Sequence, residues 1–161
     1  MKIQIVNTND EIIGLKDCGN LDYKKDIYRA SALWITNSKG KILLARRSYS
    51  KKQNPGKWGP AVAGIIEDGE TYGSNITKEA EEELGLKKIK PKKSIKRLEK
   101  GEYKHFTQWF ILKSDLKLED LKVNKEEVAE VKWFTKKEVL KLIETNSDEV
   151  LKGIKKWINL F

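Results

Sequence analysis

The sequence predicts an α/β fold in which helices pack on the faces of a mixed β-sheet. Segments rich in β-branched and aromatic residues alternate with turn-forming residues along most of the chain. One helical pattern interrupts them near the middle, and two more follow the last predicted strand. The 161 residues, 39% hydrophobic and 35% charged, are typical of one globular domain with its own core.

The first half of the chain is expected to be mostly strand. An opening hairpin is predicted because apolar residues alternate at 3–5, turn-forming residues occupy 7–10, and isoleucines return at 12–13. A second hairpin is expected where Asn-Ser-Lys-Gly separates two apolar runs. The strands expected after the opening hairpin are 28–36, 41–47 and 61–66, with a turn at 37–40 and a basic loop at 48–60.

The second half is expected to mix helices and strands. A helix is predicted over 74–84 and should stop at Gly85, since glycine is favoured just after a helix. Apolar residues between positions 151 and 161 recur at helical spacing. The remaining expected elements are strands at 89–98, 105–112 and 128–134 and helices at 136–145 and 149–161.

Composition excludes several classes of protein. No apolar run approaches the roughly 18 residues of a membrane-spanning helix. With a single cysteine, Cys18, no internal disulfide can form, and the opening residues lack a secretory pattern, so we expect a cytoplasmic protein. The net charge is +9, but only four of the 33 basic residues are arginine and the lysines are scattered, which favours a solvated surface over a nucleic-acid groove.

An acidic cluster stands out in this basic chain. Residues 67–83 hold seven carboxylates opposed only by Lys78. On a helix, Glu79, Glu82 and Glu83 share one face, where like charges repel. Oxygen ligands without cysteine or histidine suit Mg²⁺ or Mn²⁺. The cluster therefore predicts a divalent-cation site, with an ordinary solvated acidic helix as the alternative.

The spacing around the cluster resembles the Nudix box. Gly64 is followed after five residues by Glu70 and after seven more by Lys-Glu-Ala-Glu-Glu-Glu-Leu-Gly-Leu at 78–86. The chain departs from the box at Lys78, where the family has an arginine; lysine keeps the charge but loses the planar, two-pronged donor. The resemblance implies an α/β/α sandwich around a mixed sheet: a single Nudix domain over 1–161, with a hairpin extension at 1–26, a core at 27–161 and the box at 64–86.

The resemblance also implies an activity. Nudix hydrolases cleave a nucleoside diphosphate linked to another moiety X, through water attack on phosphorus assisted by Mg²⁺, for which Mn²⁺ can substitute. By position, the implied metal ligands and base candidates are Glu79, Glu82 and Glu83, with the backbone carbonyl of Ala63 as a further ligand. The implied structural residues of the box are Gly64, Glu70, Lys78 and Gly85.

A second pair of carboxylates lies far down the chain. Glu126 and Glu127 precede a segment similar to the family's recurring "EE-V-x-x-V-x-W" stretch. Many Nudix enzymes use a glutamate from such a loop, so either residue could reach the metal. The alternative for each is a solvated loop carboxylate.

A narrower likeness links residues 1–134 to the branch containing isopentenyl-diphosphate isomerase and its hydrolase relatives. It is carried by the opening hairpin, Tyr28-Arg29-Ala30, the segment 43–48 and Pro-Gly-Lys-Trp at 55–58. The isomerases have a catalytic cysteine about where this chain has Ala61, and a histidine where it has Ile65. We therefore expect a hydrolase and not an isomerase.

Substrate contacts are suggested by residues on either side of the box. Arg46, Arg47 and Lys57, with Lys51 and Lys52, could bind phosphates; the alternative is a basic surface loop with one structural arginine. Tyr103 lies near the spacing of a tyrosine in Nudix hydrolases of diadenosine polyphosphates.

Three functions remain open from the sequence. The first is hydrolysis of a small nucleoside diphosphate derivative. The second is removal of pyrophosphate from RNA 5′ ends, or cleavage of dinucleoside polyphosphates. The third is a non-catalytic module that binds nucleotide or RNA. A membrane is not an expected partner, and the protein is expected to be a monomer, or a homodimer formed through the opening hairpin.

Overall fold

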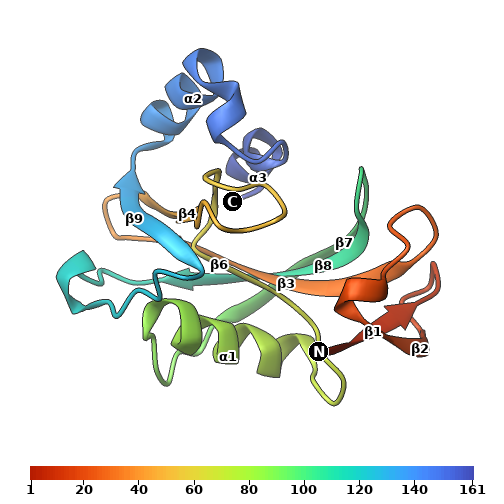
Figure 1. Cartoon of the computed structure of the whole chain (residues 1–161). Helices are drawn as coiled ribbons and strands as arrows, with labels where there is room; N and C mark the ends of the chain where they lie inside the picture. The colour runs from red at the N-terminus through yellow and green to blue at the C-terminus, as the bar shows by residue number, and fades with distance from the viewer.

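The computed structural model describes all residues, 1–161, as one mixed sheet with helices on both faces (Figure 1). No helix is long and apolar enough to cross a lipid bilayer. The strands are β1 (Lys2–Val6), β2 (Ile12–Asp17), β3 (Ile27–Thr36), β4 (Ile42–Arg47), β5 (Trp58–Pro60), β6 (Val62–Ile65), β7 (Lys92–Lys100), β8 (Lys104–Lys113) and β9 (Val128–Phe134). The helices are α1 (Tyr72–Leu84), α2 (Lys136–Thr145) and α3 (Ile154–Leu160).

Strand β3 organises the sheet. It pairs in parallel with β8 along its whole length, from Tyr28 opposite His105 to Thr36 opposite Lys113. It also pairs antiparallel with β1, β6 and β4. The expected hairpin between β3 and β4 forms, but its ladder is only two residue pairs long. Strand β4 then turns away to pair with β5 and β9, which leaves an edge of β3 free for β6.

The sheet separates two hydrophobic cores. Because side chains alternate along a strand, Leu33 and Ile35 of β3 pack toward α1, whereas Trp34 packs on the other face, toward α3. Figure 1 shows α1 below the sheet and α2 and α3 above it. The predicted α/β fold with helices on both faces is therefore confirmed.

Helix α1 has strong signals at both ends. The hydroxyl of Thr71 accepts a hydrogen bond from the Ser74 amide at 3.0 Å, and the Ser74 hydroxyl accepts one from the Thr71 amide at 2.9 Å. This capping box starts the helix at Tyr72, two residues before the predicted start. The helix ends as predicted at Gly85, whose φ of 70° is left-handed and suits glycine.

The C-terminal helix is shorter than the sequence predicts. Residues 149–161 were expected to be helical, but α3 covers only Ile154–Leu160. Val150 is extended and bridges Trp58, and the Leu151 amide donates to the Trp58 carbonyl at 2.9 Å. Residues 150 and 151 therefore bond to β5 in an extended conformation, although their helical spacing had predicted a helix. Residues 58–60, expected to be loop, form β5 because they pair with β4.

The N-terminal hairpin forms as expected and extends the sheet. Strand β1 pairs with β2, with Ile5 opposite Gly14, and with β3, with Ile5 opposite Tyr28. Strand β2 is the edge, and its Ile12, Ile13 and Leu15 are exposed. The hairpin is therefore continuous with the sheet that carries the rest of the chain.

Candidate functional site

Two glutamates one helical turn apart lie against the sheet. Glu79 and Glu83 of α1 are partly buried, whereas Glu82 is exposed. Glu79 lies directly over the backbone of β6. A Cβ atom on Gly64 would come 2.4 Å from the Glu79 Cγ, so only glycine permits this contact. Of the three helix carboxylates that the sequence grouped together, two face the sheet and one faces solvent.

The environment of these two carboxylates opposes their negative charge. Burial raises the pKa of Glu79 to about 7, Lys78 partly offsets this effect, and Glu82 adds to it. Burial raises the pKa of Glu83 to about 8, and repulsion from Glu79 and Glu127 contributes. A pair of this kind favours protons or a cation at neutral pH.

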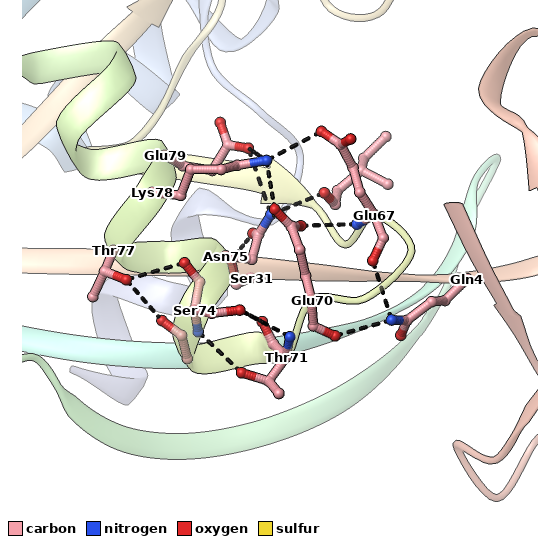
Figure 2. A network of polar contacts seen from close by, with 12 residues as sticks. Gln4, Ser31, Glu67, Glu70, Thr71, Ser74, Asn75, Thr77, Lys78 and Glu79 are labelled. Carbon is pink, nitrogen blue, oxygen red and sulfur yellow. Dashed lines mark hydrogen bonds and ion pairs between the residues drawn. The ribbon is translucent and has the colours of Figure 1, made fainter. Parts of the chain in front are cut away.

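Lys78, the departure from the Nudix pattern, lies at the centre of an ion cluster (Figure 2). Its ammonium is 2.5 Å from a carboxylate oxygen of Glu70, 3.1 Å from one of Glu67 and 3.6 Å from one of Glu79. Burial works against the charge, but hydrogen bonds to Glu70 and Glu67 hold the pKa of Lys78 above its usual value. A lysine thus reaches three carboxylates from a single nitrogen.

Glu70 joins the box loop to the start of α1. Its carboxylate accepts hydrogen bonds from the Glu67 amide at 2.9 Å and from the Asn75 side chain at 2.8 Å. Although burial opposes ionisation, the bonds from Lys78, Glu67 and Asn75 lower the pKa of Glu70. These bonds tie Glu70 to the loop and to α1; the structural role implied for it by the resemblance stays a prediction.

Asn75 is a polar member of this network that the sequence interpretation missed. It is fully buried, accepts a hydrogen bond from the Ser31 hydroxyl of β3, and donates to the Ile65 carbonyl at 3.0 Å. Its amide also lies 3.5 Å from a carboxylate oxygen of Glu79. The available signal was its position four residues before Glu79, which places both on one helix face.

The structure separates the two downstream glutamates. The loop before β9 docks on the end of α1, where the Asn124 amide donates to the Glu83 carbonyl at 2.8 Å. Glu127 forms an ion pair with Lys51 and is close enough to raise the pKa of Glu83. Glu126 is exposed. Only Glu127 is brought to the helix carboxylates.

The two arginines of β4 also separate. Arg46 donates to the Gly56 carbonyl at 2.8 Å, pairs with Glu149 at 3.1 Å, and lies over the Trp58 ring. Its guanidinium is thus engaged on the face covered by α2 and α3, in the structural role that was the alternative to phosphate contact.

Arg47 points to the carboxylates. Burial lowers the pKa of its guanidinium, whereas Glu83 and Glu127 raise it, and its Nε donates to the Gln53 carbonyl at 3.0 Å. Lys57 forms no side-chain hydrogen bond or ion pair, and Lys52 is exposed. Among the predicted phosphate-binding residues, Arg47 and Lys51 are those that meet the acidic site.

Tyr103 lies in a cluster of aromatic residues that is linked to Arg47 through Gln53. Its ring meets that of Tyr23 edge to face, with centroids 4.8 Å apart, and His105 stacks on Tyr28 at 5.0 Å. The Tyr23 hydroxyl accepts a hydrogen bond of 2.7 Å from Gln53, whose carbonyl binds Arg47. Gln53, in the loop between β4 and β5, thus connects the aromatic cluster to Arg47 at the acidic site.

The residues at the site fit a hard divalent cation by their chemistry. The donors are carboxylate oxygens, two of them partly buried and with raised pKa values, which suits Mg²⁺ or Mn²⁺. No three Asp, Glu, His or Cys side chains lie close enough together to form a complete metal site. The ligand set Glu79, Glu82, Glu83 and Ala63 therefore stays a prediction.

Comparisons with known proteins show what this chain is similar to. The family model described as NUDIX domain matches residues 27–154. An uncharacterised Nudix hydrolase of Listeria monocytogenes is 31% identical over 145 residues, covering 84% of this chain and 80% of the relative. An uncharacterised Nudix hydrolase of Yersinia pestis is 26% identical over 161 residues, covering 97% of this chain and 85% of the relative.

Solved structures show the same fold. The crystal structure of DR0079 from Deinococcus radiodurans superimposes with a TM-score of 0.84 at 22% identity, covering 99% of this chain and 98% of the other. The NUDIX domain of Shewanella oneidensis NrtR, solved with ADP ribose, superimposes with a TM-score of 0.66 at 16% identity, covering 88% and 91%.

Proposed function

The chain belongs to the Nudix family and is a hydrolase acting on phosphoric anhydride bonds; from this premise we propose that it uses Mg²⁺ to cleave the diphosphate linkage of a nucleoside diphosphate joined to a second moiety. The observation that carries the proposal is the Glu79 and Glu83 pair, partly buried and with pKa values raised to about 7 and about 8. A bound cation would neutralise this pair of carboxylates, and hydrolysis of a diphosphate also requires a cation to neutralise the phosphate charge.

Glu79 and Glu83 would hold the cation, with Glu82 and the Ala63 carbonyl as further ligands. When bound, Mg²⁺ would neutralise phosphate charge and lower the pKa of an attacking water; Mn²⁺ would substitute. Lys78 keeps Glu79 in place through its contact at 3.6 Å. Lys78 therefore takes the orienting role that the family gives to arginine.

The proton of the attacking water needs an acceptor. We assign this role to Glu127, because it approaches Glu83 from a separate loop and need not bind the cation itself. Its pairing with Lys51 fixes its position. General-base catalysis requires such a carboxylate within hydrogen-bond reach of the water. Glu126, one residue earlier, points to solvent and has no part in the proposal.

Arg47 and Lys51 would contact the substrate phosphates, since they are the cations that meet the carboxylates. Tyr103 and Tyr23 offer aromatic surface for the nucleoside or for the second moiety. The second candidate substrate is a dinucleoside polyphosphate, because the spacing of Tyr103 is similar to that of a tyrosine in Nudix hydrolases of diadenosine polyphosphates.

A hydrolysis screen with Mg²⁺ tests the proposal. The panel contains nucleoside di- and triphosphates, ADP-ribose, nucleotide sugars, dinucleoside polyphosphates and 5′-triphosphate RNA. We expect Mg²⁺-dependent hydrolysis, measured by the nucleotide products formed, that is lost in Glu83→Gln and kept in Glu126→Gln, the matched control. Turnover of RNA that weakens steeply with salt would instead assign the RNA 5′ end as substrate. Nucleotide binding without turnover of any compound would establish a non-catalytic module.

A further inference from the structure

The N-terminal hairpin forms main-chain bonds to the loop of the Nudix box. The Gln4 amide donates to the Ile66 carbonyl at 3.3 Å, and the Asp68 amide donates to the Lys2 carbonyl at 2.9 Å. Ile3 and Glu67 form an antiparallel bridge between these bonds. Strand β1 therefore supports the segment between β6 and α1, in addition to its pairing with β2 and β3.

The side chain of Gln4 adds two bonds to the same loop (Figure 2). It is 3% exposed, and its Nε2 donates to the carbonyls of Glu67 at 3.1 Å and Glu70 at 2.9 Å. Its Oε1 accepts from Arg29 at 2.9 Å. The orientation of the amide is fixed, because reversing it would place the oxygen against two carbonyls and the NH₂ against a guanidinium.

Arg29 ties the tip of the hairpin to the same assembly. It donates to the Asp10 carboxylate at 2.7 Å and to the Asp10 carbonyl at 2.6 Å. The Asp10 carboxylate, whose side chain is 5% exposed, also accepts from the Tyr72 hydroxyl at 2.9 Å. Tyr72 is the first residue of α1, so the hairpin contacts the box loop at both of its ends.

The loop that Gln4 holds leads directly to the acidic site. The carbonyl of Glu70 accepts from Gln4, and its carboxylate binds Lys78 at 2.5 Å and Asn75 at 2.8 Å. Both of these residues approach Glu79. Three consecutive contacts thus join a residue of the hairpin to a predicted cation ligand.

We propose that Gln4 is a positioning residue for the cation site, acting through Glu70 and Lys78 on Glu79. The inference rests on the proposed function, which makes Glu79 a ligand. The NUDIX family match begins at residue 27, so Gln4 lies outside it. Through Gln4, the hairpin in residues 1–26 then contributes to the geometry of the cation site.

Two substitutions remove the donated bonds in different ways. Gln4→Glu keeps the size of the side chain and the contact with Arg29 but sets a carboxylate oxygen against the carbonyls of Glu67 and Glu70. Gln4→Met keeps the length and introduces no charge. The matched control is Lys16→Met on β2, opposite Ile3, which breaks the 2.7 Å ion pair with Asp26 and removes no bond to the box loop.

Mn²⁺ affinity, measured by calorimetry well below the melting temperature, is the decisive readout. Removing groups that orient metal ligands typically weakens binding about 10- to 100-fold; because Gln4 acts through an intermediate residue, we expect a loss of about 3- to 10-fold in both Gln4 variants. Hydrogen exchange should accelerate at the amides of Glu67, Asp68 and Glu70, while β3 stays protected. Lys16→Met should leave Mn²⁺ affinity unchanged.

The possible outcomes separate the inference from the function beneath it. If the wild type and both Gln4 variants bind Mn²⁺ equally, or if Lys16→Met weakens binding as much, the positioning role is overturned and the cation site stands. If the wild type binds no Mn²⁺, the proposed cation site fails and the positioning role fails with it. Should Gln4→Glu not fold, Gln4→Met decides.

Discussion

The Lys78 ammonium lies 2.5 Å from the Glu70 carboxylate, at the position where the Nudix pattern places an arginine. The same nitrogen contacts Glu67 and Glu79, so the substitution keeps the charge in the middle of the cluster. Lys78 therefore brings a positive charge to the same three carboxylates through one nitrogen.

Two replacements of Lys78 test whether its positive charge is what matters: Lys78→Met removes the charge and Lys78→Arg keeps it. Lys78→Met should lower kcat about 10-fold or more, since three carboxylates then repel without a cation between them. It should also lower the free energy of unfolding by about 1–2 kcal/mol, because the ion contacts of Lys78 are lost; the loss is modest because Lys78 is partly exposed to solvent. Lys78→Arg should keep kcat within a few-fold. Steady-state kinetics and urea unfolding measure both effects; equal kcat in all three proteins would refute the role of Lys78.

Gly64 is predicted to tolerate no side chain. In Gly64→Ala the new Cβ would lie 2.4 Å from the Glu79 Cγ and displace that carboxylate. Overpacking of this kind costs about 1–3 kcal/mol in stability, and we expect kcat to fall about 10-fold or more. The control is Gly14→Ala, whose Cβ meets nothing within 4 Å. Equal kinetics for the two variants would contradict the assignment.

The adjacent glutamates of the loop before β9 form an internal comparison. Glu127→Gln should reduce kcat about 100-fold, the lower end of the usual loss of a general base, with little change in KM. Glu126→Gln should behave as wild type, because Glu126 faces solvent. Single-turnover assays of both variants decide the matter, and the reverse result would move the proposed base by one residue.

Metal-free stability should fall as pH rises from about 4.5 to about 8. Burial raises the folded pKa of Glu83 to about 8 from its usual value of 4.5, so the folded state holds a proton that the unfolded state releases in this range. In Glu83→Gln this carboxyl no longer titrates, so the variant should lose up to about 1.4 kcal/mol less stability per pH unit than the wild type. Melting curves in a chelator at pH 6 and 8 should thus lie closer together in the variant, with the remaining difference due to Glu79, and added Mg²⁺ should stabilise only the wild type at pH 8.

Asp10 should stabilise the hairpin in the opposite pH direction. Despite burial, hydrogen bonds from Lys96, Arg29 and Tyr72 lower the pKa of Asp10 below 3.8. Its contribution is present above pH about 4 and lost as pH falls below that value.

Asp10→Asn tests this contribution, because asparagine also tolerates the positive φ of 62°. The variant should lose about 2–4 kcal/mol in the free energy of unfolding at pH 7, since it leaves the partly buried Arg29 without a charge partner, and less at pH 3. Denaturant titrations at both pH values measure the difference. A loss that does not change with pH would show that the charge of Asp10 is unimportant.

The sequence by itself determined the local parts of this protein. The segment from Gly64 to residue 86 resembled the Nudix box, and Gly85 predicted the end of α1, because both patterns are contained in a short, continuous stretch of the chain. Strand alternation predicted β3 and β9 nearly to the residue. Where bonding partners lie close along the chain, the pattern of residues is sufficient.

Tertiary structure alone decided which of several equivalent residues reach the site. Arg46 and Arg47 are adjacent, as are Glu126 and Glu127, and composition cannot distinguish them; the pairing of β4 and the docking of the loop on α1 bring only one of each pair to Glu83. Gln4 resembles any polar strand residue until β1 places it against Glu67 and Glu70, more than 60 positions away. These contacts depend on how distant segments pair across the sheet, and local residue pattern does not contain that information.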